Sequence, residues 1–172
     1  MVNYLDDRNL VFDRSAVRHH RVRALGNQYN PLFSEVGERL ADRLLDVRRH
    51  FALALDLGTR DGHCVRAINA TGRVERLVLC DSSPKGLNTE IGADFPAVAA
   101  VADEEMLPFA AESLELVTSS LTLHWTNDLP GVLAQLRRAL KPGGLLLAAL
   151  FTGDTLRELR AALTEAEAAE RG

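Results

Sequence analysis

The chain has 172 residues, of which 47% are hydrophobic and 26% are charged, proportions typical of a soluble globular domain. Its formal net charge of −4 argues against a surface that binds nucleic acid. Cys64 and Cys80 have neither the spacing of a disulfide framework nor further ligands for zinc, so we expect no metal site. The sequence shows no signal peptide and no apolar stretch long enough to cross a membrane, which predicts a cytoplasmic location.

Residues 1–48 are predicted to form an N-terminal helical segment. Within it, residues 11–25 are rich in arginine and histidine and carry apolar residues such as Phe12, which indicates a short surface helix. Its arginines suit either a solvated helix face or a lid over an anionic ligand or carrier. Residues 33–47 repeat apolar side chains at helical spacing, which predicts a helix packed on the main domain.

From residue 49 onward, short apolar runs alternate with helical patterns. The predicted strands are residues 51–57, 76–80, 97–102, 114–119 and 145–151. Helices are predicted after Gly62, at residues 82–84, from Asp128 and from Asp154. This alternation predicts an α/β fold with a Rossmann-like, doubly wound, mostly parallel sheet of about five strands. The last run follows a predicted break at residues 141–144 and is apolar throughout, which favours an interior strand.

Acidic residues end the first three predicted strands: Asp56, Asp81 and Asp103. Each alone is equally well explained as a helix cap, but together they point to a ligand site at one sheet edge. Asp81 lies about 20 residues beyond Gly62, a separation that suits hydrogen bonds to ribose hydroxyls. Gly58 and Gly62 predict a tight turn into a helix whose free N–H groups attract an anion. A nucleoside with a zwitterionic tail fits this pattern, and S-adenosylmethionine meets that description, with Asp56 facing its ammonium group.

Several stretches of the chain resemble the class I S-adenosylmethionine-dependent methyltransferases. These are residues 56–58, Asp81, and residues 101–109, 119–130, 140–144 and 153–159. The likeness is to the subgroup that contains the malonyl-carrier-protein O-methyltransferase of biotin synthesis and an arginine hydroxylase that acts as an assembly factor of respiratory complex I. Residues 12–14 also resemble that subgroup, and the whole resemblance covers about residues 12–167. For a eukaryotic member it implies a mitochondrial matrix location.

The resemblance implies S-adenosylmethionine as cofactor and assigns roles to matching residues. The residues expected to bind the cofactor are Asp56, Gly58, Arg60, Gly62, Asp81, Ser82, Asp103, Glu104, Ser119 and Leu121. Asp81 would hold the ribose, Asp103 the adenine amino group, and residues 119–121 the floor beneath the sulfonium. His124 is the catalytic candidate, because it could remove a proton from the nucleophile, although a His-Trp pair is also common as a packed structural element.

Two features depart from the family pattern. Arg60 stands where the family has a glycine, and a side chain at a position of positive φ costs about 1–2 kcal/mol. Arg60 would then either weaken cofactor binding, which we favour, or bind the cofactor carboxylate. In addition, the family usually adds two strands after the fifth, so residues 49–172 are expected to form a C-terminally incomplete cofactor-binding domain. The fifth strand would then be an exposed edge that could pair two copies of the chain.

The leading hypothesis is methyl transfer from S-adenosylmethionine to a small or carrier-bound nucleophile, with a carboxyl group as one candidate. A second hypothesis is hydroxylation of an arginine in a subunit of respiratory complex I by an assembly factor. A third is a non-catalytic, methyltransferase-like remnant whose cofactor site Arg60 has disabled.

Overall fold

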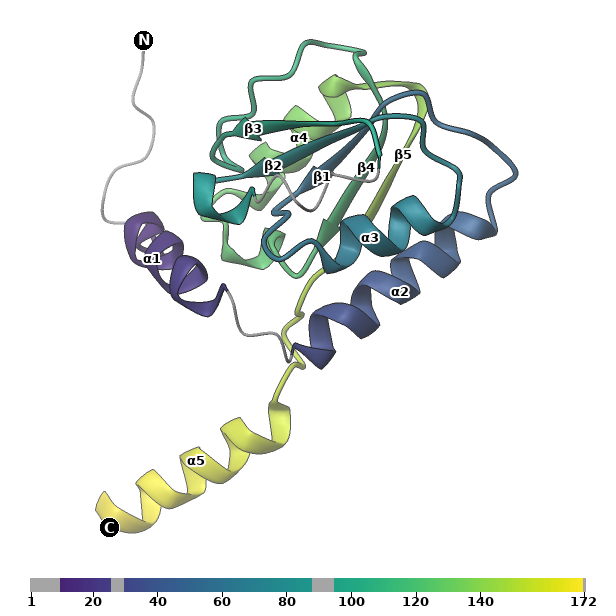
Figure 1. Cartoon of the computed structure of the whole chain (residues 1–172). Helices are drawn as coiled ribbons and strands as arrows, with labels where there is room; N and C mark the ends of the chain where they lie inside the picture. Colours follow the sequence, from purple (N-terminus) through teal and green to yellow (C-terminus); the bar gives the residue numbers. More distant parts are fainter. Residues whose placement is uncertain (1–9, 26–29, 88–94, 172) are drawn as a thin grey trace, which may run out of the picture.

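The computed structural model describes residues 10–25, 30–87 and 95–171 as one α/β unit with helices on both faces of a sheet (Figure 1). The helices are α1 (Arg14–Ala24), α2 (Pro31–Leu45), α3 (His63–Ala70), α4 (Leu129–Ala139) and α5 (Arg157–Arg171). The strands are β1 (Ala54–Leu57), β2 (Leu77–Asp81), β3 (Ala97–Val101), β4 (Leu114–Ser120) and β5 (Leu140–Ala149). Short 3-10 turns follow β2 at Pro84–Gly86 and β4 at Leu123–Trp125.

The five strands form one sheet in the order β3-β2-β1-β4-β5, and every neighbouring pair is parallel. The predicted Rossmann-like parallel sheet is therefore confirmed. Strands β1 and β2 are buried along their whole length, because helices cover them on both sides. One core packs α2 and α3 against one face of the sheet, and a second core packs α4 against the other face.

Strand β5 differs from its prediction. It lies at the edge of the sheet, so the prediction of an interior strand is wrong, and the alternative of an edge strand holds for the described residues. The strand also begins earlier than residue 145: Leu140 pairs with Leu114, Leu145 pairs with Leu116, and residues 141–144 form an irregularity between these pairs. Gly143 has a φ of 72°, so the predicted break is a bulge within the strand.

The two end helices behave differently. Helix α1 begins at the capping residue Asp13, whose carboxylate accepts hydrogen bonds from the N–H groups of Ser15 and Ala16. Helix α5 begins at Arg157 rather than Asp154 and extends away from the sheet, with residues 157–170 exposed (Figure 1). Within the described ranges, we find no helix with the length and apolar character needed to cross a membrane.

Candidate functional site

The turn after β1 lies at the carboxyl edge of the sheet and is held in an unusual backbone conformation. Gly58, Arg60 and Gly62 all have positive φ values, of 81°, 52° and 76°. A Cβ atom at Gly58 would lie 2.1 Å from the hydroxyl oxygen of Thr122, so this position requires glycine. Arg60 occupies a left-handed conformation with a side chain, as expected for a residue in place of a glycine, at a cost of about 1–2 kcal/mol.

The Arg60 side chain packs against Phe33 of α2. Its guanidinium carbon lies 4.2 Å from the centre of the Phe33 ring, which is a cation–π distance. Its Nε atom is buried and has no hydrogen-bond partner in the part of the chain that the structure describes. Burial lowers the pKa of Arg60, and the positive charge of Arg21 lowers it further. Arg60 is therefore a half-buried cation that is incompletely satisfied.

Asp56 and Ser119 lie inside the sheet. Asp56 is 1% exposed, and one of its carboxylate oxygens accepts a hydrogen bond of 2.7 Å from the hydroxyl of Thr118. Burial raises the pKa of Asp56. The hydroxyl of Ser119 donates to the backbone carbonyl of Leu57 at 2.9 Å, which ties β4 to the start of the turn. Asp56 and Ser119 thus connect β1 to β4 just before the turn.

Asp81 ends β2 directly beside the turn. Its Oδ1 accepts a hydrogen bond from the N–H of Ser83 at 2.9 Å, and its Oδ2 accepts one from the N–H of Arg60 at 3.3 Å. Burial raises the pKa of Asp81. Gly86 approaches so closely that a Cβ atom there would lie 2.7 Å from the carboxyl carbon. Since a carboxylate has about four acceptor positions, Asp81 retains capacity for hydroxyl donors. Ser82, between Asp81 and Ser83, is half-buried.

Asp103 and Glu104 follow β3 and contact arginines of α1. Asp103 Oδ1 accepts hydrogen bonds from Arg14 Nη2 at 2.7 Å and from the N–H of Glu105 at 2.9 Å. Burial alone would raise the pKa of Asp103, but these donors together lower it. Glu104 is fully buried and accepts hydrogen bonds from both Arg14 and Arg21. Helix α1 is thereby tied to the carboxyl edge of the sheet by ion pairs.

These ion pairs were not found from the sequence. The interpretation of these arginines as a solvated helix face is correct for the exposed Arg18 and Arg23. It is wrong for Arg21, which is 6% exposed. Arg14 and Arg21 are seven residues apart and so share one face of α1, and this spacing was the available signal. The acid that they share, Glu104, could not be identified without the fold.

His124 lies in the turn after β4 within an aromatic cluster. Its ring centre is 5.3 Å from that of Trp125 and 4.7 Å from that of Phe151, and Trp125 packs edge-on against Phe12 at 5.4 Å. Both ring nitrogens are buried and lack hydrogen-bond partners among the described residues. Burial lowers the pKa of His124, and nearby arginines lower it further. The imidazole is therefore neutral near pH 7, as a proton acceptor requires. Leu121, nearby, has a φ of 49° and is buried.

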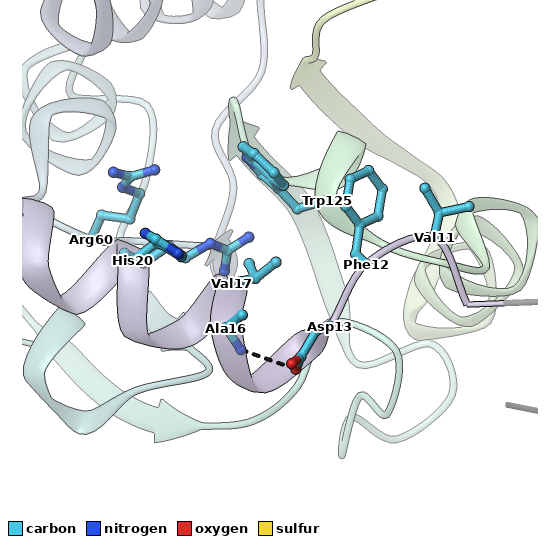
Figure 2. A pocket seen from close by; sticks show the side chains of 9 residues that line it. Val11, Phe12, Asp13, Ala16, Val17, His20, Arg60 and Trp125 are labelled. Carbon is cyan, nitrogen blue, oxygen red and sulfur yellow. Dashed lines mark hydrogen bonds between the residues drawn. The ribbon is translucent and has the colours of Figure 1, made fainter.

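A cavity of about 360 Å³ lies between α1 and the turn after β1, within the size range of small-molecule sites (Figure 2). Its lining residues are Val11, Phe12, Asp13, Ala16, Val17, His20, Arg21, Arg60 and Trp125. Of the predicted cofactor residues, Arg60 is the one in this lining. The others lie at the adjoining sheet edge, apart from Leu121, which lines a separate hollow between α2 and the end of β5.

Comparison with known proteins gives consistent results. Residues 55–148 match a family model described as a methyltransferase domain. The mitochondrial arginine-hydroxylase NDUFAF5 of Danio rerio is 44% identical over 94% of this chain and 51% of its own length. A malonyl-[acyl-carrier protein] O-methyltransferase of Methylovorus is 36% identical over 88% of this chain and 55% of its own length. The chain thus spans about half the length of the curated relatives that it matches.

Solved structures show the same fold. The N-methyltransferase NodS of Bradyrhizobium japonicum, solved with S-adenosyl-L-homocysteine, superposes with a TM-score of 0.65 at 18% identity, over 79% of this chain and 72% of NodS. At that identity the likeness concerns the fold alone. The chain belongs to the methyltransferase-domain family, because the family model matches residues 55–148, more than half of its length.

Proposed function

We propose that the chain binds S-adenosylmethionine at the carboxyl edge of its sheet and supports methyl transfer to a small or carrier-bound nucleophile. The observation that carries this proposal is the position of Asp81. This buried carboxylate ends the strand next to β1, contacts the backbone of the turn after β1 and retains acceptor capacity for ribose hydroxyls. The sequence match to a methyltransferase-domain family leads to the same expectation, that the chain binds S-adenosylmethionine.

The remaining groups at this edge fit such a ligand. The hydrogen bonds from Arg14 and from the N–H of Glu105 both fall on Oδ1 of Asp103, so its Oδ2 suits the adenine amino group. Gly62 precedes α3 and provides no side-chain cap, so the N–H groups in the first turn of α3 suit the carboxylate of the methionine portion. Asp56 would face the ammonium group from within the sheet, and the backbone around Leu121 would form the floor beneath the sulfonium. Arg60 is the misfit, because its side chain adds bulk and strain to the turn.

In this arrangement the cofactor supplies the methyl group. His124 would take the proton from the attacking nucleophile, since its neutral imidazole has both nitrogens free among the described residues. Helix α1, tied down by Glu104, would exclude water from the reacting atoms. The acceptor would be a small molecule or a group carried by a protein.

A second candidate is an assembly factor of respiratory complex I that hydroxylates an arginine in a partner subunit. It is favoured by identity: the four vertebrate relatives named arginine-hydroxylase are 40% to 44% identical, the one from Dictyostelium discoideum is 35% identical, and the O-methyltransferases are 35% to 37% identical. The names of the arginine-hydroxylase relatives give a mitochondrial location, and for a eukaryotic protein this candidate implies the mitochondrial matrix. A bacterial protein would act in the cytoplasm. Pairing of two chains through the exposed β5 edge is compatible with either activity.

The first test is calorimetric titration of the chain with S-adenosylmethionine. The variants are Asp81→Ala, which removes the proposed ribose contact, Arg60→Gly, which relieves the strained turn, and Asp42→Ala as a matched control on the exposed face of α2. Binding that Asp81→Ala abolishes and Asp42→Ala preserves would support the proposal. Binding by Arg60→Gly alone would indicate a disabled site, the third hypothesis. No binding by any variant would refute cofactor binding.

A second measurement separates the two activities. The chain is incubated with a carrier-bound carboxylate and S-adenosylmethionine, and separately with an arginine-containing peptide, O2 and a reductant, because hydroxylation inserts one oxygen atom of O2 and needs two electrons to reduce the other. Each product is weighed by mass spectrometry. A gain of a methylene group on the carboxylate supports methyl transfer. A gain of an oxygen atom on the arginine peptide supports the assembly-factor candidate and overturns methyl transfer as the leading activity.

A further inference from the structure

The cavity between α1 and the turn after β1 adjoins the proposed cofactor groups without including them. Asp56, Asp81 and Asp103 are absent from its lining, which comes from residues 11–21, Arg60 and Trp125. A ligand in this cavity would therefore contact a different set of side chains from the cofactor. Its chemistry can be argued from that lining.

The charges that line the cavity leave one arginine uncompensated. Arg21 is paired with Glu104, and the carboxylate of Asp13 caps α1. Arg60 has no carboxylate within salt-bridge distance among the residues that the structure describes. The nearby Asp61 faces other groups, with Oδ2 3.1 Å from the amide nitrogen of Asn30. Asp13 brings a negative charge to the lining, but Arg60 is the cation there that lacks a carboxylate partner among the described residues, and His20 lines the same cavity.

The strained backbone conformation of Arg60 is a second reason to expect that its charged side chain contacts a ligand. The residue has a φ of 52°, although glycine occupies the two other left-handed positions of the same turn, Gly58 and Gly62. A glycine at position 60 would avoid the strain of about 1–2 kcal/mol. A strained residue whose side chain reaches a cavity is a candidate for a functional contact.

The opposite side of the cavity is apolar. Figure 2 shows Trp125, Phe12 and Val11 grouped on one side, with Arg60 and His20 on the other. Phe12 and Trp125 pack edge to face, and Trp125 is 38% exposed, so its ring is available to a ligand. Such rings provide contact area for a flat apolar body.

We propose that this cavity binds an amphipathic anion, whose carboxylate pairs with Arg60 and whose apolar body lies against Phe12 and Trp125. As a binding site the cavity does not require a bound cofactor, although Arg60 also contacts Asp81 through its backbone N–H. As the acceptor site of the methyl transfer it rests on the proposed function. A guanidinium ligand is disfavoured there, because its charge has the same sign as that of Arg60.

The test uses the fluorescence of Trp125, which is the single tryptophan of the chain. Three probes share one phenylbutyl body: phenylbutyrate is an anion, phenylbutyramide is neutral and phenylbutylamine is a cation. Phenylbutyrate should change the Trp125 emission in a saturable manner and bind at least about tenfold more tightly than the other two probes. The Arg60→Gln variant should remove this preference, whereas Arg18→Gln, on the exposed face of α1, should retain it.

The probe series on the unmodified chain decides the matter even if Arg60→Gln fails to fold. Equal binding of all three probes would refute the ion pair and leave only an apolar hollow. No saturable response to any probe would refute the site. The phenylbutyrate titration is run without S-adenosylmethionine, and S-adenosylmethionine binding is measured separately by calorimetry, so a failure of this site is distinguishable from a failure of the proposed function.

Discussion

Replacing Glu104 by alanine should destabilise the native protein strongly. Glu104 is fully buried and accepts hydrogen bonds from Arg14 and Arg21, whose side chains are 17% and 6% exposed. Removing the acid leaves these cations without their shared partner, and breaking a buried ion pair in this way costs about 3–5 kcal/mol. Arg14 would keep Asp103 at 2.7 Å, whereas Arg21 would keep the carbonyl of Thr122 at 3.4 Å. Arg21 therefore accounts for the larger part of the loss.

Undocking of α1 from the sheet would limit the loss of stability that is measured for Glu104→Ala. If α1 leaves the sheet, Arg21 regains water, and the cost of Glu104→Ala cannot exceed the free energy with which α1 docks. The assay is urea unfolding followed by circular dichroism, with Trp125 fluorescence as a reporter of α1, since Phe12 packs on that ring. The exposed Glu38→Ala on α2 is the control and should change stability by at most about 0.5 kcal/mol. A similarly small loss for Glu104→Ala, with unchanged Trp125 emission, would refute the reasoning.

Three further predictions concern titration, thiol reactivity and the proposed ribose contact. The pKa of His124 is lowered by burial and by two arginines, so the unfolded chain binds its proton more readily. Stability should therefore fall as pH drops below about 6.5, and urea midpoints should show less of this fall in His124→Gln. Burial raises the pKa of Cys64 and raises that of Cys80 to about 12, so both thiols should resist a disulfide reagent until urea unfolds the chain. Rapid labelling of the native chain would contradict this. Gly86→Ala should displace the Asp81 carboxylate and weaken S-adenosylmethionine binding about tenfold, and unchanged calorimetric affinity would argue against Asp81 as the ribose contact.

The parts of the fold that the sequence predicted are those with a local signal. Apolar runs of strand length alternate with helical patterns, and each acid at a strand end is adjacent to its strand. For this reason the parallel sheet, the turn between Gly58 and Gly62, and the positions of Asp81 and Asp103 at one edge could be predicted. The positive φ at Arg60 was expected from the resemblance, because the family has a glycine at that position.

The parts that were missed depend on long-range contacts. Arg14 and Glu104 are separated by 90 positions, so no local pattern joins them. The edge position of β5 depends on which strand pairs next, and the apolar character of residues 145–151 fits an edge or an interior equally well. The irregular pairing at residues 141–144 depends on the register with β4. Proline and glycine there indicated an interruption but not that the strand would resume.

The carboxyl edge of the sheet brings together three acids and three arginines, and their pairing limits which ligands it can accept. Both oxygens of Glu104 pair with arginines of α1, and Arg14 also pairs with one oxygen of Asp103. The groups that remain for a ligand are Oδ2 of Asp103, Asp81 and Arg60. Asp81 and Arg60 are the pair in contact: the acceptor capacity of Asp81 suits neutral hydroxyl donors, and the charge of Arg60 lacks a carboxylate among the described residues. These two groups touch through the backbone N–H of Arg60. A hydroxyl-bearing nucleoside on one side of this contact and an anion on the other would satisfy both, which joins the cofactor site and the cavity through a single residue.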